Sequence, residues 1–396
     1  MATNGNRLKL VDLAEIVTGM TPPSADDGNW GDGPMFLTPT DISRNDYFPK
    51  SSRALSLSSS KKHKSRVIDK PAIAVVCIGA TIGKIARIST PTLTNQQINS
   101  IVPHPNLLDT DFIYYRMQLM VDYLRQLAGG SATPLLVKSV FEQIEIEVPP
   151  IKEQMAIGRF LSQIDQLINL NNVSITELEN LSELIYKYWF LQFNFPRADG
   201  TLVSSQDIDL KFDEALQRDV PKDWQVVKLG DLCDIYQPVT ISGKDLKKNG
   251  QYKVYGSNGI IGSYDKFNHV ESEIVVSCRG DCGNVIRTLP NSWITGNAMV
   301  FKPNIDYLSN EYLFQSLKNL NLKNIVTGSV QGQITRGNVE NLSILLPPRD
   351  LLETYSGLVD SIVIYKQQLI YENETLQSQL DYLLPLLMFG GLELSG

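Results

Sequence analysis

The sequence predicts an α+β protein in which two similar mixed α/β domains are separated by two long antiparallel coiled-coil helices, as a tandem repeat with a pseudo-two-fold axis. Three observations support this prediction. The chain of 396 residues is long enough for roughly two to four domains. It repeats itself once, with an offset of about 200 residues, and each copy ends in a long apolar stripe with helical spacing.

The internal repeat is carried by pairs of segments that keep their order along the chain. A few net insertions in the first copy account for the drift in offset from one pair to the next. The pairs are LKLVDLAEI at 8–16 with VKLGDLCDI at 227–235, AIAVVCIGATIGKIAR at 72–87 with EIVVSCRGDCGNVIR at 273–287, DFIYYRM at 111–117 with EYLFQSL at 311–317, and the segment 130–150 with 328–348. We therefore interpret the chain as a tandem duplication of one module.

Each copy begins as a mixed α/β domain. Short apolar runs, such as the one at 73–78, are bounded by Gly, Asn and Pro, as is typical of strands. Glycine segments around Gly79 and Gly280 recur in both copies, which indicates a shared backbone turn rather than a unique active site. We expect these two domains at 1–150 and 220–348.

A helical pattern follows the double proline that ends each domain, where prolines are tolerated in a first helical turn. It predicts a central spacer helix at 151–195 and a C-terminal spacer helix at 349–388, with a linker at 196–219 and a tail at 389–396. Helices of ~40 residues are about 60 Å long, too long for one small domain each to cover. We therefore expect the two helices to pair antiparallel, with the domains at opposite ends of a rod.

The pairing surfaces of the two helices are predicted by a three-four spacing of apolar residues. Polar residues interrupt them at Asn171 and Ser182 in the first helix and at Lys366 and Asn373 in the second. The apolar positions are Ile157, Leu161, Ile164, Ile168, Ile175, Leu178, Ile185 and Trp189 in the first, and Leu352, Tyr355, Val359, Ile362, Leu369, Leu376, Leu380 and Leu383 in the second.

Composition excludes several classes of protein. Hydrophobic residues make up 42% and charged residues 20%, which is typical of a folded soluble chain. No run approaches the ~20 apolar residues that span a bilayer, and the polar start lacks the apolar core of a signal peptide, which predicts a cytoplasmic protein. Four cysteines and three scattered histidines form neither a disulfide framework nor a zinc-ligand pattern, so no metal is predicted.

Motifs for catalysis are absent from the sequence. It contains no GxxxxGK[ST] phosphate loop, no Asn/Asp-Pro-Pro-aromatic motif of adenine methyltransferases, and no GxSxG or HExxH motif. The glycines of GSNGIIG at 256–262 lack a clear strand-loop-helix setting and are interpreted as turn glycines. The sequence therefore predicts a chain without a catalytic site or a cofactor of its own.

The net charge of −7 would by itself argue against nucleic-acid binding. The charges are unevenly distributed, however. Between residues 44 and 66, Asp46 is the only acidic residue, while the basic residues are Arg44, Lys50, Arg53, Lys61, Lys62, Lys64 and Arg66. A basic face on a nearly neutral domain is compatible with DNA binding.

Over nearly its whole length, the chain resembles the specificity subunit of type I restriction-modification systems. The resemblance rests on the order and the duplication of its motifs. Taken one at a time the motifs are weak. Those of the first half are LKLVDLAEIVTGMTP at 8–22, LTPTDIS at 37–43, TNQQINSI at 94–101, GSATPLLVKS at 130–139, VPPIKEQ at 148–154 and YWFLQFNFP at 188–196. Those of the second half are VPKDWQVVKLGDLCDI at 220–235, YGSNGIIG at 255–262, GSVQGQIT at 328–335 and LPP at 346–348.

This resemblance implies a subunit of host defence without catalysis of its own. Its two domains would be target recognition domains, each reading one half of a bipartite, asymmetric DNA site, held apart by the helices. It would bind two methyltransferase subunits, which carry S-adenosylmethionine and methylate adenine, and restriction subunits that use ATP and Mg²⁺. Two departures stand out: PPRDLLE at 347–353 lacks the glutamine of PPIKEQ, and the first copy has no counterpart of YGSNGIIG.

The candidate DNA contacts are basic and polar residues in predicted loops, where each is also compatible with a solvated surface. A KKHKSR run such as that at 61–66 is more typical of a solvated loop than of a phosphate clamp. In the first domain the candidates are Lys61, Lys62, Lys64, Arg66, Thr133 and Lys138. In the second they are Lys244, Lys247, Lys248, Arg279, Gln331, Gln333, Thr335 and Arg336. The aromatic residues Tyr188, Trp189, Phe190 and Phe193 are expected to pack a domain against a helix, or to hold a methyltransferase subunit.

Two other functions compete with DNA recognition. A coiled-coil scaffold without DNA contact would explain the helices, but not two loop-rich domains with local basic clusters. A self-sufficient DNA-modifying enzyme would need a cofactor loop or an acid-base pair, and the sequence shows neither. Salt-sensitive DNA binding by the purified chain would count against the scaffold.

Overall fold

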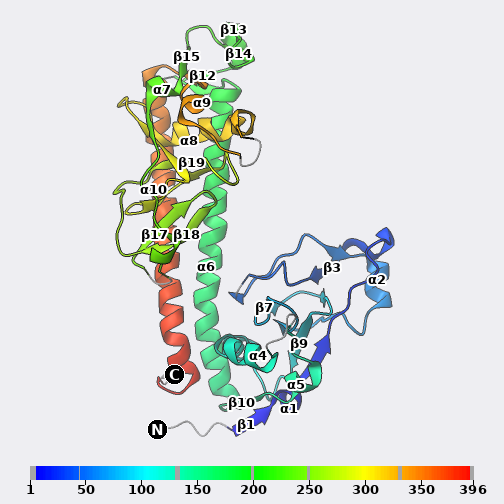
Figure 1. Cartoon of the computed structure of the whole chain (residues 1–396). Coiled ribbons are helices and arrows are strands. Elements are labelled where there is room, and N and C mark those ends of the chain that lie inside the picture. Colours follow the sequence, from blue (N-terminus) through cyan, green and yellow to red (C-terminus); the bar gives the residue numbers. More distant parts are fainter. Residues whose placement is uncertain are drawn as a thin grey trace. The chain divides into compact units, whose positions relative to one another are not determined.

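The computed structural model describes residues 6–43, 45–129, 134–197, 200–247, 250–328 and 332–392 (Figure 1). It divides into two compact units: unit 1 comprises Met1–Asn172 and Tyr371–Gly396, and unit 2 comprises Val173–Ile370. The two predicted long helices are confirmed as α6 (Ile151–Tyr186) and α10 (Arg349–Met388). The boundary between the units falls within both helices, so each unit contains a mixed α/β domain, hereafter its head, and part of each helix.

The head of unit 1 is built on two small sheets. The larger has the strand order β2-β9-β6-β7-β4, and the smaller has the order β5-β3-β8. A separate antiparallel pair, β1 with β10, leads into the long helix. The strands are β1 (Asn6–Lys9), β2 (Ala14–Thr18), β3 (Trp30–Leu37), β4 (Asn45–Asp46), β5 (Ala54–Leu55), β6 (Ala72–Val76), β7 (Ile85–Ile88), β8 (Thr92–Thr94), β9 (Ile98–Pro103) and β10 (Glu145–Val148). The helices are α1 (Leu10–Leu13), η1 (Asp27–Asn29), α2 (Leu57–Lys62), α3 (Thr110–Leu119), α4 (Val121–Leu127) and α5 (Lys138–Glu142).

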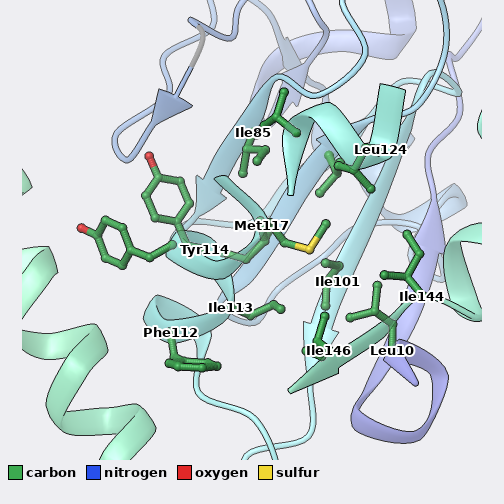
Figure 2. Close-up of a cluster of buried hydrophobic side chains, with 14 of the residues drawn as sticks. Leu10, Ile85, Ile101, Phe112, Ile113, Tyr114, Met117, Leu124, Ile144 and Ile146 are labelled. Atoms are coloured by element: carbon green, nitrogen blue, oxygen red, sulfur yellow. The ribbon is translucent and has the colours of Figure 1, made fainter. Parts of the chain in front are cut away.

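The core of unit 1 lies where helix α3 packs on the larger sheet. Every residue of the central strand β6 is buried, which explains why its sequence is a continuous apolar run rather than an alternating one. Figure 2 shows Ile113 and Met117 of α3 pointing toward the same core as Ile101 and Ile146 of the strands. Asp109 caps α3 by accepting a hydrogen bond from the amide of Phe112 at 2.9 Å.

Unit 2 repeats this plan. Its main sheet has the order β16-β22-β19-β20, which matches β2-β9-β6-β7 of unit 1, and its pair β15–β23 matches β1–β10. A third sheet has the order β18-β17-β21. The strands are β15 (Gln225–Lys228), β16 (Cys233–Tyr236), β17 (Tyr252–Gly256), β18 (Gly259–Tyr264), β19 (Ile274–Ser277), β20 (Val285–Arg287), β21 (Trp293–Ile294), β22 (Ala298–Pro303) and β23 (Ser343–Leu346). The helices are α7 (Leu229–Leu232), η4 (Gly243–Asp245), α8 (Asn310–Asn319), η5 (Leu322–Ile325) and α9 (Arg336–Glu340). The tandem repeat read from the sequence is therefore confirmed.

The segment between the two copies is structured. Helix α6 is followed by the π-helical turn η2 (Lys187–Leu191). Two short antiparallel sheets lie in the predicted linker and at its ends, with η3 (Ser205–Asp207) between them. The first sheet pairs β11 (Phe195–Pro196) with β12 (Leu202–Val203), and the second pairs β13 (Leu210–Asp213) with β14 (Arg218–Pro221).

Aromatic side chains join this segment to the head and the long helices of unit 2. The ring of Phe190 lies 4.8 Å from that of Tyr312 in α8 and 4.9 Å from that of Tyr355 in α10. Trp189 and Phe193 are also buried, whereas Tyr188 is 46% exposed. Packing of the aromatic run against the unit is thus confirmed for three of its four residues.

The long helices pair antiparallel within each unit. In unit 1, the side-chain amide of Asn171 donates a hydrogen bond to Asn373 at 3.0 Å, and Asn373 donates one to Asn172 at 3.0 Å. In unit 2, the ammonium of Lys366 lies 3.2 Å from the carboxylate of Glu179. Early residues of α6 thus meet late residues of α10, and polar positions of the predicted seams meet polar partners. Such pairs fix the register of a coiled coil at some cost in stability.

The joint between head and helix differs between the units. In unit 1, Gln154 is buried at the start of α6, where its side chain donates to the carbonyls of Leu107 and Pro149 and accepts from the amide of Asp109. In unit 2, the buried Leu352 takes the corresponding place, counted from the double proline. Where the second copy lacks the glutamine, the contact between head and helix is therefore apolar instead of polar.

A buried carboxylate in unit 1 predicts a pH dependence. Asp165 of α6 accepts a hydrogen bond from the hydroxyl of Tyr115, and burial raises its pKa from 3.8 to about 6. Because the folded-state pKa is the higher one, the folded chain favours the protonated form, and stability falls as the pH rises from about 4 to about 6. We expect Asp165→Asn to remove this loss and to stabilise unit 1 by about 3 kcal/mol above pH 6.

Hydrogen exchange of the α3 amides between pH 4 and 8 would measure this effect as the difference between variant and parent. Asp122→Asn is a matched control, because that carboxylate is 89% exposed. A slope that persists in Asp165→Asn would assign the pH dependence to another group. The second copy already has an apolar residue, Val363, at the corresponding position.

Candidate nucleic-acid interface

In unit 2, two loops that are far apart in sequence pair at the end of the main sheet. The first is the glycine turn after β19, and the second leads into α9. Arg279 and Gln333 form an isolated antiparallel bridge between them, and the amide of Ile334 donates to the carbonyl of Cys278 at 3.0 Å. Both Arg279 and Gln333 are exposed. We call the described residues 278–283 and 332–336 the paired loops of unit 2.

The backbone of the first loop depends on its glycines. Gly280 and Gly283 have φ angles of 78° and 92°, which L side chains rarely adopt. Beneath the turn, the buried Cys282 donates a hydrogen bond from its thiol to the carbonyl of Gly332 at 3.3 Å. The glycines and the cysteine therefore serve to hold the two loops together, and the side chain of Arg279 is left on the surface.

Unit 1 has the same pair of loops, at 77–83 and 134–138. Ile78 and Leu135 form the corresponding antiparallel bridge. The amide of Gly79 donates to the carbonyl of Pro134 at 2.9 Å, and that of Leu136 to the carbonyl of Cys77 at 2.8 Å. The two heads thus share this backbone arrangement, but present apolar side chains in unit 1 where unit 2 presents an arginine and a glutamine.

Each second loop ends with a cation at the first residue of a short helix. Lys138 begins α5 and lies 3.5 Å from Glu142, while Arg336 begins α9 and lies 2.6 Å from Glu340. Thr335 is the N-cap of α9 and accepts from the amide of Asn338 at 3.3 Å. Because exposed ion pairs of this kind contribute little to stability, both cations are available for a phosphate. The structure therefore brings four of the candidates, Arg279, Gln333, Thr335 and Arg336, together on the paired loops of unit 2.

The basic cluster of unit 1 lies on another element. Lys61 and Lys62 are exposed in the last turn of α2, where their positive charges interact favourably with the helix dipole. Lys64 is exposed just after this helix. Arg66 is exposed too, but its guanidinium donates to the carbonyl of Thr18 at 2.7 Å. Three of these four cations therefore extend from one helix end, and the fourth is tied to the first strand of the main sheet.

The candidates near β17 and β18 are less free. Lys244 is exposed in η4. Lys247 pairs through its backbone with Ser263, and its ammonium forms an ion pair with Asp265. The hydrogen bond to Asp265 raises the pKa of Lys247. The remaining candidates, Thr133, Lys248 and Gln331, lie outside the residues that the structure describes.

Two further cations line a hollow in unit 1. Lys50 and Arg53 border a cavity of about 700 Å³ next to α2, and the guanidinium of Arg53 lies 3.8 Å from the ring centroid of Trp30. Neither was among the predicted contacts. The excess of basic residues between 44 and 66 was the signal that could have singled them out.

Among the described residues, no cluster of three or more His, Cys, Asp or Glu side chains is able to hold a metal ion. Burial raises the pKa of both Cys77 and Cys233 to about 12, so these thiols stay protonated and unreactive at neutral pH. None of the described helices is long and apolar enough to cross a membrane.

Comparisons with known proteins agree on one family. The family model for the type I restriction modification DNA specificity domain matches residues 6–180 and 221–371. The MjaIX specificity subunit of Methanocaldococcus jannaschii is 25% identical over 421 aligned positions, covering 97% of this chain and 92% of that protein. The HindI specificity subunit of Haemophilus influenzae is 32% identical over 179 positions, covering 43% and 38%.

A solved structure shares the fold. The S subunit of the type I restriction-modification system from M. genitalium matches 98% of this chain and 96% of its own with a TM-score of 0.63 and 16% sequence identity. The match extends over both units, in agreement with the duplicated architecture.

Proposed function

The chain belongs to the family of type I restriction-modification DNA specificity proteins, and on this premise we propose that it reads a bipartite, asymmetric DNA site. It directs adenine methylation and restriction by partner subunits to that site. The observation that carries this proposal is the duplicated pair of loops. Two surfaces with one backbone arrangement and different side chains suit two half-sites with different bases. Neither a scaffold nor a self-sufficient enzyme accounts for that duplication.

The division of the chain follows from this role. Residues 1–150 and 220–348 act as target recognition domains, joined through the segment 196–219. The central helix at 151–195 and the C-terminal helix at 349–388 act as spacers. The paired loops, together with the end of α2, supply the contacts, with the basic residues binding phosphate and Arg279 and Gln333 suited to base edges in the major groove.

The chemistry belongs to partners. Two methyltransferase subunits would supply S-adenosylmethionine, and restriction subunits would supply ATP-driven cleavage, while this chain supplies no catalytic group. The assembly works on chromosomal and invading DNA, and we place it in the cytoplasm.

A map of methylated adenine tests the proposal. It compares cells that carry this chain and its cognate methyltransferase with the same cells lacking the chain. We expect one bipartite motif to lose methylation throughout the genome in the second strain. Unchanged methylation, in cells where the complex is shown to assemble, would contradict the proposed function.

Single substitutions on the paired loops separate base reading from phosphate binding. Arg279→Ala is expected to reduce discrimination at one base pair of one half-site by roughly 10- to 100-fold, since a good bidentate contact contributes about 1–3 kcal/mol. Lys138→Ala is expected to weaken binding to all sequences equally and to lower the slope of log K against log salt by about 1. Competition binding with a panel of single-base variants at two salt concentrations measures both effects.

Lys302→Ala is a matched control for these two variants. Lys302 is an exposed lysine of the second head that lies 3.5 Å from Glu271, outside the paired loops. We expect it to change neither specificity nor salt dependence. If it behaved as Lys138→Ala does, the paired loops would have no special part in binding.

A further inference from the structure

Both heads contain an ion pair at the same place, between a strand of the main sheet and the helix that packs beside it. In unit 1, Arg87 of β7 lies 2.5 Å from Asp111 of α3. In unit 2, Arg287 of β20 lies 2.9 Å from Glu311 of α8. Both pairs are mostly shielded from solvent, and the repeat in sequence places them at equivalent positions.

In unit 1 this ion pair is covered by a tyrosine. The hydroxyl of Tyr47 donates to the carboxylate of Asp111 at 2.9 Å, and the guanidinium of Arg87 lies 5.0 Å from the ring centroid. The ring packs edge-to-face on Tyr114 at 5.3 Å and also lies near Tyr115, at 6.3 Å. Only 7% of Tyr47 is exposed. The side chain thus fills a site made of an arginine, a carboxylate and aromatic walls.

In unit 2 the equivalent residues surround a cavity of about 300 Å³. No aromatic ring of a described residue lies over Arg287. Two residues of its wall differ from unit 1, where glutamine replaces a tyrosine and valine replaces an aspartate. The corresponding residues are Arg287 for Arg87, Glu311 for Asp111, Phe314 for Tyr114, Gln315 for Tyr115 and Val363 for Asp165.

A polar group in the wall of this cavity lacks a partner. Gln315 is 2% exposed, and its amide nitrogen donates to Glu311 at 2.9 Å. Its carbonyl oxygen is buried and accepts no hydrogen bond from any described residue. A buried acceptor without a donor is costly, so a ligand that brings an O–H or N–H group to it is favoured.

The charges of the wall favour a neutral ligand. Besides the Arg287–Glu311 pair, the cavity is bordered by Lys318 and Lys366. Lys318 lies 3.2 Å from Glu183 and Lys366 lies 3.2 Å from Glu179. Each cation of the described wall therefore already has a carboxylate partner, and an anion would have to compete for it.

We propose that this cavity of unit 2 binds a neutral, hydroxylated aromatic ring, such as a phenol or a tyrosine side chain. The ring takes the place that Tyr47 takes in unit 1, with its face toward Arg287 and its edge against Phe314 and Val363. Its hydroxyl donates to Gln315 or Glu311. The volume is at the lower end of the roughly 300–1,000 Å³ that small-molecule sites occupy, as suits a single ring. This inference is independent of which DNA sequence the chain reads.

The probe is p-cresol, the side chain of tyrosine as a free molecule, and toluene is the same molecule without the hydroxyl. We titrate the full chain, with methyl-labelled Val, Leu and Ile, and follow the methyl resonances of Leu289, Val363 and Ile370, which line the cavity. We expect saturable shifts with p-cresol, and binding of toluene about tenfold weaker, because it leaves the buried acceptor unpaired. Gln315→Met keeps the shape of the side chain, and should weaken p-cresol about tenfold but leave toluene unchanged.

Two further variants keep the result interpretable. Val363→Phe fills the cavity and should abolish the shifts. Tyr47→Ala opens the equivalent site in unit 1, so added p-cresol should restore part of the lost thermal stability, which shows that p-cresol can occupy a site of this kind. If p-cresol rescued Tyr47→Ala but did not bind unit 2, or if p-cresol and toluene bound unit 2 equally well, the proposal would be overturned.

The ring can come from a free phenol or from a partner protein, and one more titration distinguishes them. The p-cresol titration is repeated on the chain assembled with its methyltransferase subunits. Loss of the probe from the assembled complex identifies the ring as a tyrosine of the partner. Undiminished binding identifies the site as one for a free ligand.

Discussion

Removing one heptad from each long helix is expected to shorten the gap between the two half-sites by about three base pairs. Seven residues of α-helix are about 10 Å long, and successive base pairs are about 3.4 Å apart. Seven residues are also nearly two full turns, so the apolar seam stays in phase. Residues 173–179 of α6 and 365–371 of α10 are suitable, because they contain the paired Glu179 and Lys366 and leave the Asn171–Asn373 pair in place.

The experiment maps methylated adenine in cells that express the shortened chain with its methyltransferase. Duplicating the same two segments should lengthen the gap by a similar amount, which makes it the matched control. Deleting the segment from α6 alone leaves the helices unequal and should abolish function rather than shift the gap. A shortened chain that still methylates the parental spacing would show that the helices do not set it.

Replacing residues 1–150 by the corresponding head of a related subunit is expected to change one half-site completely and to leave the other untouched. The paired loops of unit 1 lie entirely within the exchanged segment, and so do all five strands of its main sheet. The critical contacts to preserve are those at the start of α6. Gln154 should therefore stay with a head that offers carbonyls like those of Leu107 and Pro149.

The same adenine map measures this exchange. A matching exchange of 220–348 should change the opposite half-site, and the double exchange should yield a fully new site. A single exchange that altered both half-sites, or neither, would contradict the modular interpretation. If an exchange abolished all methylation, assembly of the complex would have to be checked first. The two exchanges together provide this check, because both of them fail only if the helices that they share fail.

The architecture was predictable because a periodic pattern can be recognised in the sequence without knowledge of any contact. The repeat gave two equivalent heads, and the spacing of apolar residues gave both long helices and several of their polar positions. That Asn171 meets Asn373 could not be read from the sequence, since several antiparallel registers bury the same apolar residues. The hairpin β13–β14 was interpreted as linker, because two short strands, of which the first is mostly exposed, have little periodic signal.

The site could be predicted only in outline. Residue type singled out cations in loops, and the repeat pointed to the loops that pair. Sequence could not reveal that Arg66 reaches the carbonyl of Thr18 or that Lys247 is neutralised by Asp265, because those partners are remote along the chain. The repeat already aligned Ile78 with Arg279 and Leu135 with Gln333, but it could not show that the two loops bridge at these residues, because that pairing is tertiary.

The paired loops have a consequence for how such a protein can change its target. They are joined by backbone hydrogen bonds and shaped by glycines, so the side chains that project from them contribute little to folding. Substitutions at Arg279, Gln333 and their counterparts are therefore nearly neutral for stability, whereas most core substitutions cost about 0.5–3 kcal/mol. New specificities can accumulate there without a loss of folded protein. The recognised DNA sequence can therefore change during evolution while the fold of the domain is kept.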